Sequence, residues 1–113
     1  MSIITHMDLE ARMRDGTVLR ADAYHPSADG QYPVLLCRTP YDKSAEKQAE
    51  IGPKLAARGY LVVMQDVRGR YASGGDFHPG FYSAEHDDAE DGYDTVEWAA
   101  VLPWSNGKVG TFG

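Results

Sequence analysis

The chain has 113 residues, of which 42% are hydrophobic and 25% charged, an ordinary composition for one soluble globular domain. Its net charge is −6, and its 11 Lys and Arg residues form no basic stripe, so we expect no nucleic-acid partner. No apolar run reaches the roughly 18 residues of a membrane span, and residues 1–6 lack the features of a signal peptide. We therefore expect no membrane partner and a cytoplasmic location.

The first elements along the chain are two strands of a hairpin, over residues 7–14 and 17–25. Asp15 and Gly16 between them predict a two-residue turn, because glycine accepts the positive φ that such turns require. Side chains alternate along the second strand, which is typical of a strand with two different faces.

A continuous apolar run over residues 33–38 predicts a strand buried on both faces, and it makes Cys37, the single cysteine, a buried and inert thiol. Residues 52–59 predict a helix, with Pro53 in its first turn and Gly59 at its exit. Residues 60–65 predict a second buried strand that ends at Asp66.

A glycine-rich loop over residues 68–80 precedes a helix that begins at Asp87 or Asp88 and runs to about Ala100. The residues predicted to share its packed face are Ala89, Tyr93, Val96 and Ala100. Asn106 and Gly107 predict a turn before a final buried strand over residues 108–113. Strands that alternate with helices indicate an α/β fold, with an antiparallel hairpin leading into a mostly parallel sheet with flanking helices.

Four motifs, in this order and spacing, resemble one family of serine hydrolases, which includes bacterial cocaine esterase, the α-amino-acid ester hydrolases and the X-Pro dipeptidyl-peptidases. They are Arg-Thr-Pro-Tyr-Asp-Lys at 38–43, Gln-Asp-Val-Arg-Gly-Arg at 65–70 followed by Ser73 and Gly74, Glu-Asp-Gly-Tyr-Asp at 90–94 with Trp98, and Trp-Ser-Asn-Gly-Lys-Val-Gly at 104–110.

The resemblance implies that residues 1–113 are the N-terminal portion of one α/β-hydrolase catalytic domain. Gly113 matches the first glycine of the Gly-x-Ser-x-Gly nucleophile elbow, so the serine, aspartate and histidine of the triad would lie beyond it. The intact protein would hydrolyse ester or amide bonds of a small molecule or a peptide, without cofactor or metal. Residues 1–113 alone are expected to be inactive and poorly soluble, and the oligomeric state is left open.

The same resemblance assigns a catalytic role to Tyr41, because the family's matching tyrosine donates its hydroxyl to the oxyanion. A donor aimed at that oxygen contributes roughly 2.7–4 kcal/mol to lowering the barrier. Thr39 stands where the family often has asparagine, which leaves the local backbone bonding open.

Asp66 and Arg68 follow a buried strand at the carboxyl edge of the predicted sheet, the usual ligand side of such folds. Arginine could hold a substrate carboxylate there, but we favour a structural brace beneath the site, since paired charges at loop bases satisfy backbone groups.

Residues 76–97 hold 8 of the 17 acidic residues, no Lys or Arg, and both His78 and His86. Such side chains can ligate metals, yet the spacing fits no common metal motif, and acids are expected at a helix N-terminus. We therefore predict a solvated acidic helix and no metal site.

Two other functions remain as alternatives. Gly110 and Gly113 could begin a glycine-rich phosphate loop of a dinucleotide-binding domain, although that fingerprint usually opens its domain. The chain could also be a non-catalytic α/β binding module, for which no residue pattern indicates a ligand.

Overall fold

A computed structural model describes residues 3–27, 30–75 and 88–113 of the chain. Five strands and two helices follow one another in the order β1 (Ile3–Arg12), β2 (Val18–Pro26), β3 (Tyr32–Thr39), α1 (Glu46–Ala56), β4 (Leu61–Asp66), α2 (Asp88–Ala100) and β5 (Ser105–Thr111). Neither described helix is long and apolar enough to cross a bilayer.

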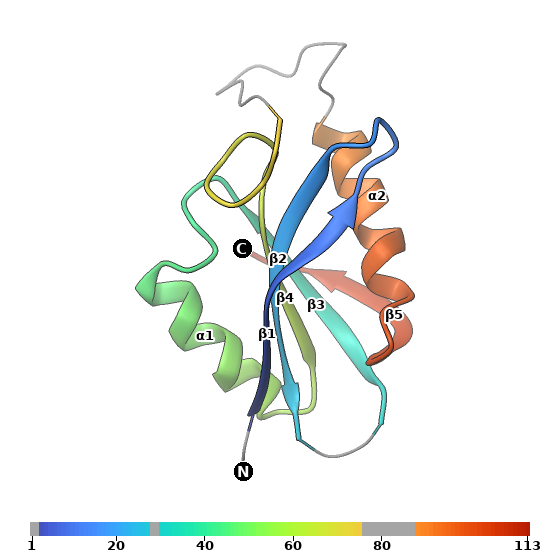
Figure 1. Cartoon of the computed structure of the whole chain (residues 1–113). Coiled ribbons are helices and arrows are strands. Elements are labelled where there is room, and N and C mark those ends of the chain that lie inside the picture. The colour runs from blue at the N-terminus through green and yellow to red at the C-terminus, as the bar shows by residue number, and fades with distance from the viewer. Residues whose placement is uncertain (1–2, 28–29, 76–87) are drawn as a thin grey trace.

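The strands form one mixed sheet in the order β1-β2-β4-β3-β5. β1 and β2 form an antiparallel hairpin, and β2 pairs antiparallel with β4, whereas β3 pairs parallel with both β4 and β5. The two helices cover opposite faces of the sheet (Figure 1). The predicted α/β architecture, with a hairpin leading into parallel strands, is confirmed.

The core has two layers because side chains alternate along the central strands. On the α2 side, Leu61 and Val63 of β4 pack with Val34 and Leu36 of β3 and with Ala99 of the helix. The layer on the α1 side is a separate buried cluster of Tyr24, Cys37, Ala56, Val62 and Met64. Burial also raises the pKa of the Cys37 thiol, as expected for an inert cysteine.

The hairpin turn is longer than predicted. Met13 N donates to Thr17 O (2.8 Å) and Gly16 N donates to Met13 O (2.9 Å), so three residues form the loop. Gly16 has φ +87°, as in a three-residue hairpin loop that ends in a glycine bulge. The Asp-Gly pair correctly indicated the turn but not its length.

Helix α1 begins at Glu46, six residues before the predicted start, and Pro53 lies inside it. Proline is favoured in a first turn, and that preference misplaced the start. A hydrogen-bonded turn precedes the helix, with Ala45 N donating to Asp42 O (3.1 Å) and Ser44 N donating to the Asp42 carboxylate (2.9 Å).

The packed face of α2 also differs from the prediction. Tyr93 is exposed, whereas Asp91, Thr95 and Ala99 are buried at intervals of four residues. Two of these three are polar, so apolar periodicity did not predict them, although Val96 of the predicted face does pack against the core. They are tolerated in the core because each has a partner: Asp91 pairs with Arg68, and Thr95 Oγ1 donates to Gln65 Oε1 (3.1 Å).

Strand β5 begins at Ser105, so Asn106 and Gly107 lie within it rather than before it. They form an irregularity in the pairing with β3, where Tyr32 aligns with Ser105 but Val34 with Val109, and Gly107 has φ +92°. The strand was predicted to be buried, yet most of its side chains are exposed because it forms an edge of the described sheet.

Gly52 lets α1 approach β2 closely, and we predict that Gly52→Ala destabilises the protein. A Cβ at this position would lie 2.6 Å from Cδ2 and Cε2 of Tyr24, a buried ring that cannot move aside freely. Such overpacking typically costs about 1–3 kcal/mol, which outweighs the better helix propensity of alanine. Thermal unfolding should show a lowered Tm, whereas Glu50→Ala on the exposed side of α1 should leave it nearly unchanged. An equal Tm for both variants would contradict the predicted clash.

Candidate active site

The carboxyl ends of β3, β4 and β5 lie at one edge of the sheet because these three strands are parallel. Thr39 aligns with Asp66, and Leu36 aligns with Thr111, so the segments that follow the three strands emerge side by side. In open α/β sheets, ligands bind at this edge. The predicted site residues Tyr41, Asp66, Arg68 and Gly113 all lie in or next to these segments.

Asp66 organises the loops after β3 and β4. Its carboxylate has no solvent exposure and accepts hydrogen bonds from Lys43 N (2.7 Å) and Ala72 N (3.1 Å). Its backbone carbonyl accepts a third from Ser73 Oγ (2.6 Å). Burial raises the pKa of Asp66, and the two amides act in the opposite direction by stabilising the carboxylate. This buried side chain therefore joins the two loops.

Tyr41 is exposed to 76% although the backbone around it is well anchored. Tyr41 N donates to Thr39 Oγ1 (2.9 Å), and the carbonyl of Pro40 accepts from Arg70 Nε (2.9 Å). Thr39 thus accepts the local backbone hydrogen bond that its difference from the family pattern left open. The arrangement presents a phenol hydroxyl, a hydrogen-bond donor, from a loop held on both sides.

Arg68 joins three segments of the chain. Its guanidinium makes five hydrogen bonds, two to Asp91 (both 2.8 Å), two to Asp15 (2.8 and 3.2 Å) and one to Thr17 Oγ1 (2.8 Å). A guanidinium has five N–H donors, so none remains for a substrate carboxylate. The geometry is that of a brace between the β4 loop, the hairpin turn and α2.

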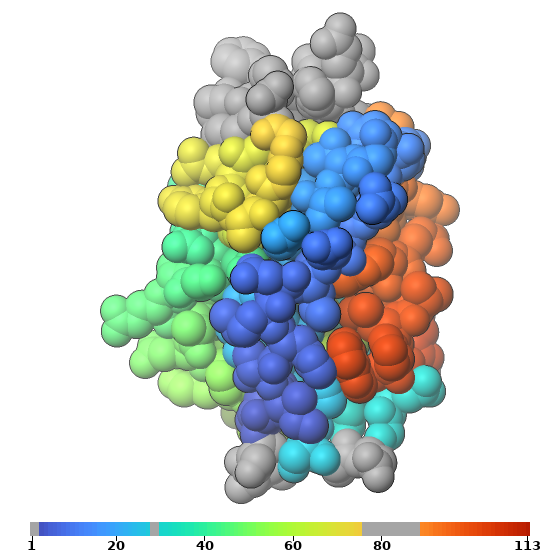
Figure 2. Space-filling view, viewed as in Figure 1, coloured from blue at the N-terminus to red at the C-terminus, as the bar shows by residue number. Residues whose placement is uncertain are grey.

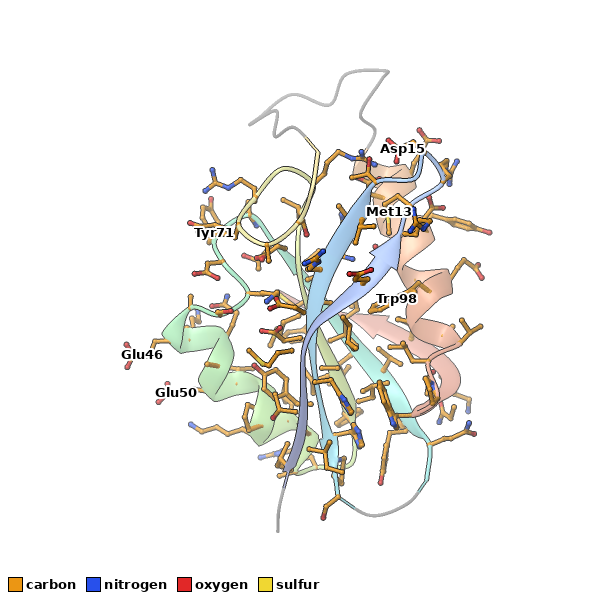
Figure 3. The ribbon with its side chains drawn as sticks, viewed as in Figure 1. Met13, Asp15, Glu46, Glu50, Tyr71 and Trp98 are labelled. Carbon is orange, nitrogen blue, oxygen red and sulfur yellow. The ribbon has the colours of Figure 1, made fainter. Side chains whose placement is uncertain are left out.

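Further contacts keep the β4 loop against the hairpin. Gly74 N donates to Val18 O (2.9 Å), and Arg20 N donates to Ser73 Oγ (2.8 Å). In the space-filling view, this loop (yellow) packs beside the hairpin (blue) (Figure 2). Figure 3 places Asp15 of the turn and Tyr71 of the loop at the same end of the molecule.

The structure also assigns a place to Lys43, to which the sequence analysis gave no role. Its side chain is only 3% exposed, and Nζ donates to Asp22 Oδ1 (2.8 Å) and Asp8 Oδ1 (2.7 Å). Burial alone would lower the pKa of Lys43, but the hydrogen bonds with these carboxylates outweigh it and raise the pKa. One signal was present in the sequence: Asp22 alternates in step with the large apolar Tyr24, which indicates a buried face.

Gly113 lies two residues after the end of β5 and has φ +90°. The strand pairing continues to its neighbour, since Phe112 N donates to Leu36 O (3.0 Å). A Cβ on Gly113 would lie 2.9 Å from Cys37 Sγ, so both the backbone conformation and the available space favour glycine here.

Two other sequence interpretations can be compared with the structure. Gly110 lies inside β5 opposite Leu35 rather than in a loop after a strand, which argues against a phosphate loop beginning there. The acid-rich segment falls partly outside the described residues, since residues 76–87, with His78 and His86, are not among them. The described ranges contain no group of three or more potential metal ligands.

Residues 15–113 match the family described as X-Pro dipeptidyl-peptidase (S15 family). The chain is 44% identical over 105 residues to a cocaine esterase from Rhodococcus sp. (strain MB1 Bresler), an alignment covering 89% of this chain and 17% of that protein.

Solved structures with the same architecture include an α-amino acid ester hydrolase, with a TM-score of 0.82 and 32% identity over 98% of this chain and 21% of the other. A CocE/NonD family hydrolase from Staphylococcus aureus has a TM-score of 0.83 and 30% identity over 100% of this chain and 23% of the other. The chain thus spans about a fifth of the length of these relatives.

The Arg68 brace generates a pH prediction. Hydrogen bonds from Arg68 and from Thr17 N lower the pKa of Asp15 to about 2. Because the folded pKa lies below the unfolded value of about 3.9, the carboxylate stabilises the fold above about pH 4, and this stabilisation is lost as the pH falls toward 2. Asp15→Asn should therefore be less stable than the parent in urea unfolding at pH 6 and nearly equal to it at pH 2. A difference that stayed constant with pH would contradict this role of Asp15.

Proposed function

The chain belongs to the X-Pro dipeptidyl-peptidase (S15) family, and on that premise we propose that it forms the N-terminal portion of the catalytic domain of a serine hydrolase. The architecture is that of the α/β-hydrolases it resembles. The proposed reaction is hydrolysis of an ester or amide bond by a serine nucleophile. Small-molecule esters are the first substrates to consider, since a cocaine esterase and an α-amino acid ester hydrolase are among the relatives.

The observation that carries the proposal is the exposed Tyr41 on its anchored loop at the carboxyl edge of the sheet. Attack on an acyl carbon places negative charge on the former carbonyl oxygen, and donors aimed at that oxygen stabilise the transition state. A neutral phenol on a fixed backbone suits this task, because it donates one hydrogen bond and needs little reorganisation. We assign Tyr41 as one donor of the oxyanion hole.

The nucleophile proposed to act with Tyr41 is a serine two residues after Gly113. In the nucleophile elbow, a strand leads into a sharp turn that exposes serine at the top of the sheet, and the amide after the serine supplies the second oxyanion donor. Support for this position comes from β5, which runs parallel to β3 and ends at the same edge as the Tyr41 loop. A histidine would act as the general base and an aspartate would orient it, both contributed by other parts of the protein.

Asp66 and Arg68 have supporting roles in this proposal. The Asp66 carboxylate is buried and accepts from backbone amides of the two loops, and the Arg68 donors are all used within the fold. Neither side chain is therefore assigned to bind substrate. The chemistry assigned to the described residues rests on Tyr41, and no step in it requires a metal or an organic cofactor.

We predict that Tyr41→Phe in the protein with its complete catalytic domain lowers kcat for p-nitrophenyl acetate about 10²- to 10³-fold, the typical effect of removing one oxyanion donor. KM should change little, because the lost hydrogen bond forms mainly in the transition state. Tyr93→Phe is a matched control, since Tyr93 is exposed on α2 and should retain the parent rate. An unchanged kcat in Tyr41→Phe would remove Tyr41 from the mechanism.

A further inference from the structure

A buried cation lies two residues from Tyr41. The Lys43 ammonium is enclosed between Asp22, which has no solvent exposure, and Asp8, whose side chain is 54% exposed. Both carboxylates come from the β1–β2 hairpin, so the contact joins the loop after β3 to an element on the other side of β4. Asp8 N also donates to Asp22 Oδ1 (3.0 Å), which holds the two acids together.

Lys43, Asp22 and Asp8 form an ion triad whose rearrangement would be energetically unfavourable. A buried charge that loses its partner is strongly unfavourable, so Asp22 constrains the position of the ammonium and the ammonium constrains Asp22. Among the described residues, Oδ2 of Asp22 is buried without a hydrogen-bond partner, and the Lys43 ammonium at Oδ1 compensates the charge of this acid. Asp8 has φ +53° at an irregularity in the β1–β2 pairing, between His6 and Leu9, and its side chain meets Lys43 there.

Lys43 is held at both its backbone and its side chain. The amide donates to Asp66 (2.7 Å) while Nζ donates to Asp22 and Asp8, so the residue is attached to β4 and to the hairpin at once. Only Asp42, with φ +82°, separates it from Tyr41. Movement of the Tyr41 backbone toward or away from the sheet edge would therefore disturb at least one of these buried contacts.

We propose that Lys43, through its ion triad with Asp22 and Asp8, is the positioning residue that aims the Tyr41 hydroxyl at the oxyanion. This inference rests on the oxyanion role proposed for Tyr41. Lys43 itself does not touch the substrate. Its contribution is to restrict where the phenol ring can point, and misplacement of a catalytic group by about 1 Å can cost on the order of 10²-fold in rate.

The test is a double-mutant cycle between the triad and Tyr41, measured on the protein with its complete catalytic domain. Lys43→Met together with Asp22→Asn removes both charges of the buried pair with little change in volume, so neither is left uncompensated. This variant is charge-free at the buried pair only, since the exposed Asp8 keeps its charge. The cycle consists of the parent, this charge-free variant, Tyr41→Phe, and the combination of all three substitutions. The measured quantities are kcat and KM for p-nitrophenyl acetate, with Lys54→Met on the exposed side of α1 as a control for the lysine substitution.

If Lys43 acts through Tyr41, the charge-free variant loses about 10- to 100-fold in kcat with KM nearly unchanged, and the same substitutions cost less than about threefold in the Tyr41→Phe background. A merely structural role would lower kcat by the same factor in both backgrounds, which would overturn the proposal. An undiminished kcat in the charge-free variant would overturn it as well.

Asp8→Gly provides a second route should the charge-free variant not fold. It removes the exposed carboxylate, keeps the buried Lys43–Asp22 pair, and suits the positive φ of this position. A loss in kcat of several-fold that disappears in the Tyr41→Phe background supports the proposal, and an equal loss in both backgrounds, or no loss, overturns it.

The two proposals can fail separately. If Tyr41→Phe keeps the full rate, the oxyanion role falls, and the positioning role falls with it. If Tyr41→Phe is slow while the triad variants keep the parent rate, only the inference about Lys43 fails.

Discussion

The architecture of the proposed site depends on the hydrogen-bonding requirement of one buried carboxylate. Asp66 ends a strand whose residues are all buried, and a carboxylate there must be satisfied by protein groups because water does not reach it. The donors are the amides of Lys43 and Ala72, from the loops after β3 and β4. These two loops are consequently held at fixed positions relative to the sheet. The exposed Tyr41 belongs to one of them, and the Arg68 brace to the other.

Buried and exposed side chains have different roles around the site. Asp22, Lys43 and Asp91 are buried and joined to elements that are distant in sequence, whereas Tyr41, proposed to donate a hydrogen bond to the oxyanion, is exposed. Because charged groups in the interior are confined to a few geometries, they can hold loops more rigidly than apolar contacts alone. Such rigidity is what electrostatic preorganisation of an oxyanion donor requires. In this proposal, buried charge determines the placement of the Tyr41 hydroxyl.

Much of this arrangement could be predicted from local sequence, and the rest depends on tertiary partners. The hairpin, the two buried strands and the position of Tyr41 after β3 follow from apolar runs, turn residues and the motif at 38–43. The start of α1 and the buried face of α2 do not. Asp91 and Thr95 are in the core because Arg68 and Gln65 meet them there, which hydrophobic periodicity cannot detect. The Lys43 triad was missed for the same reason, since its three members are spread from residue 8 to residue 43 and meet only once the strands have paired.

The most direct test of the central claim is a crystal structure of the protein with its complete catalytic domain after reaction with a fluorophosphonate. We expect the phosphorus on a serine two residues after Gly113, with its phosphonyl oxygen about 2.7–3.1 Å from the Tyr41 hydroxyl. An adduct whose oxygen is held by other donors, with the Tyr41 hydroxyl beyond hydrogen-bonding distance, would contradict the role that the structure supports for this loop.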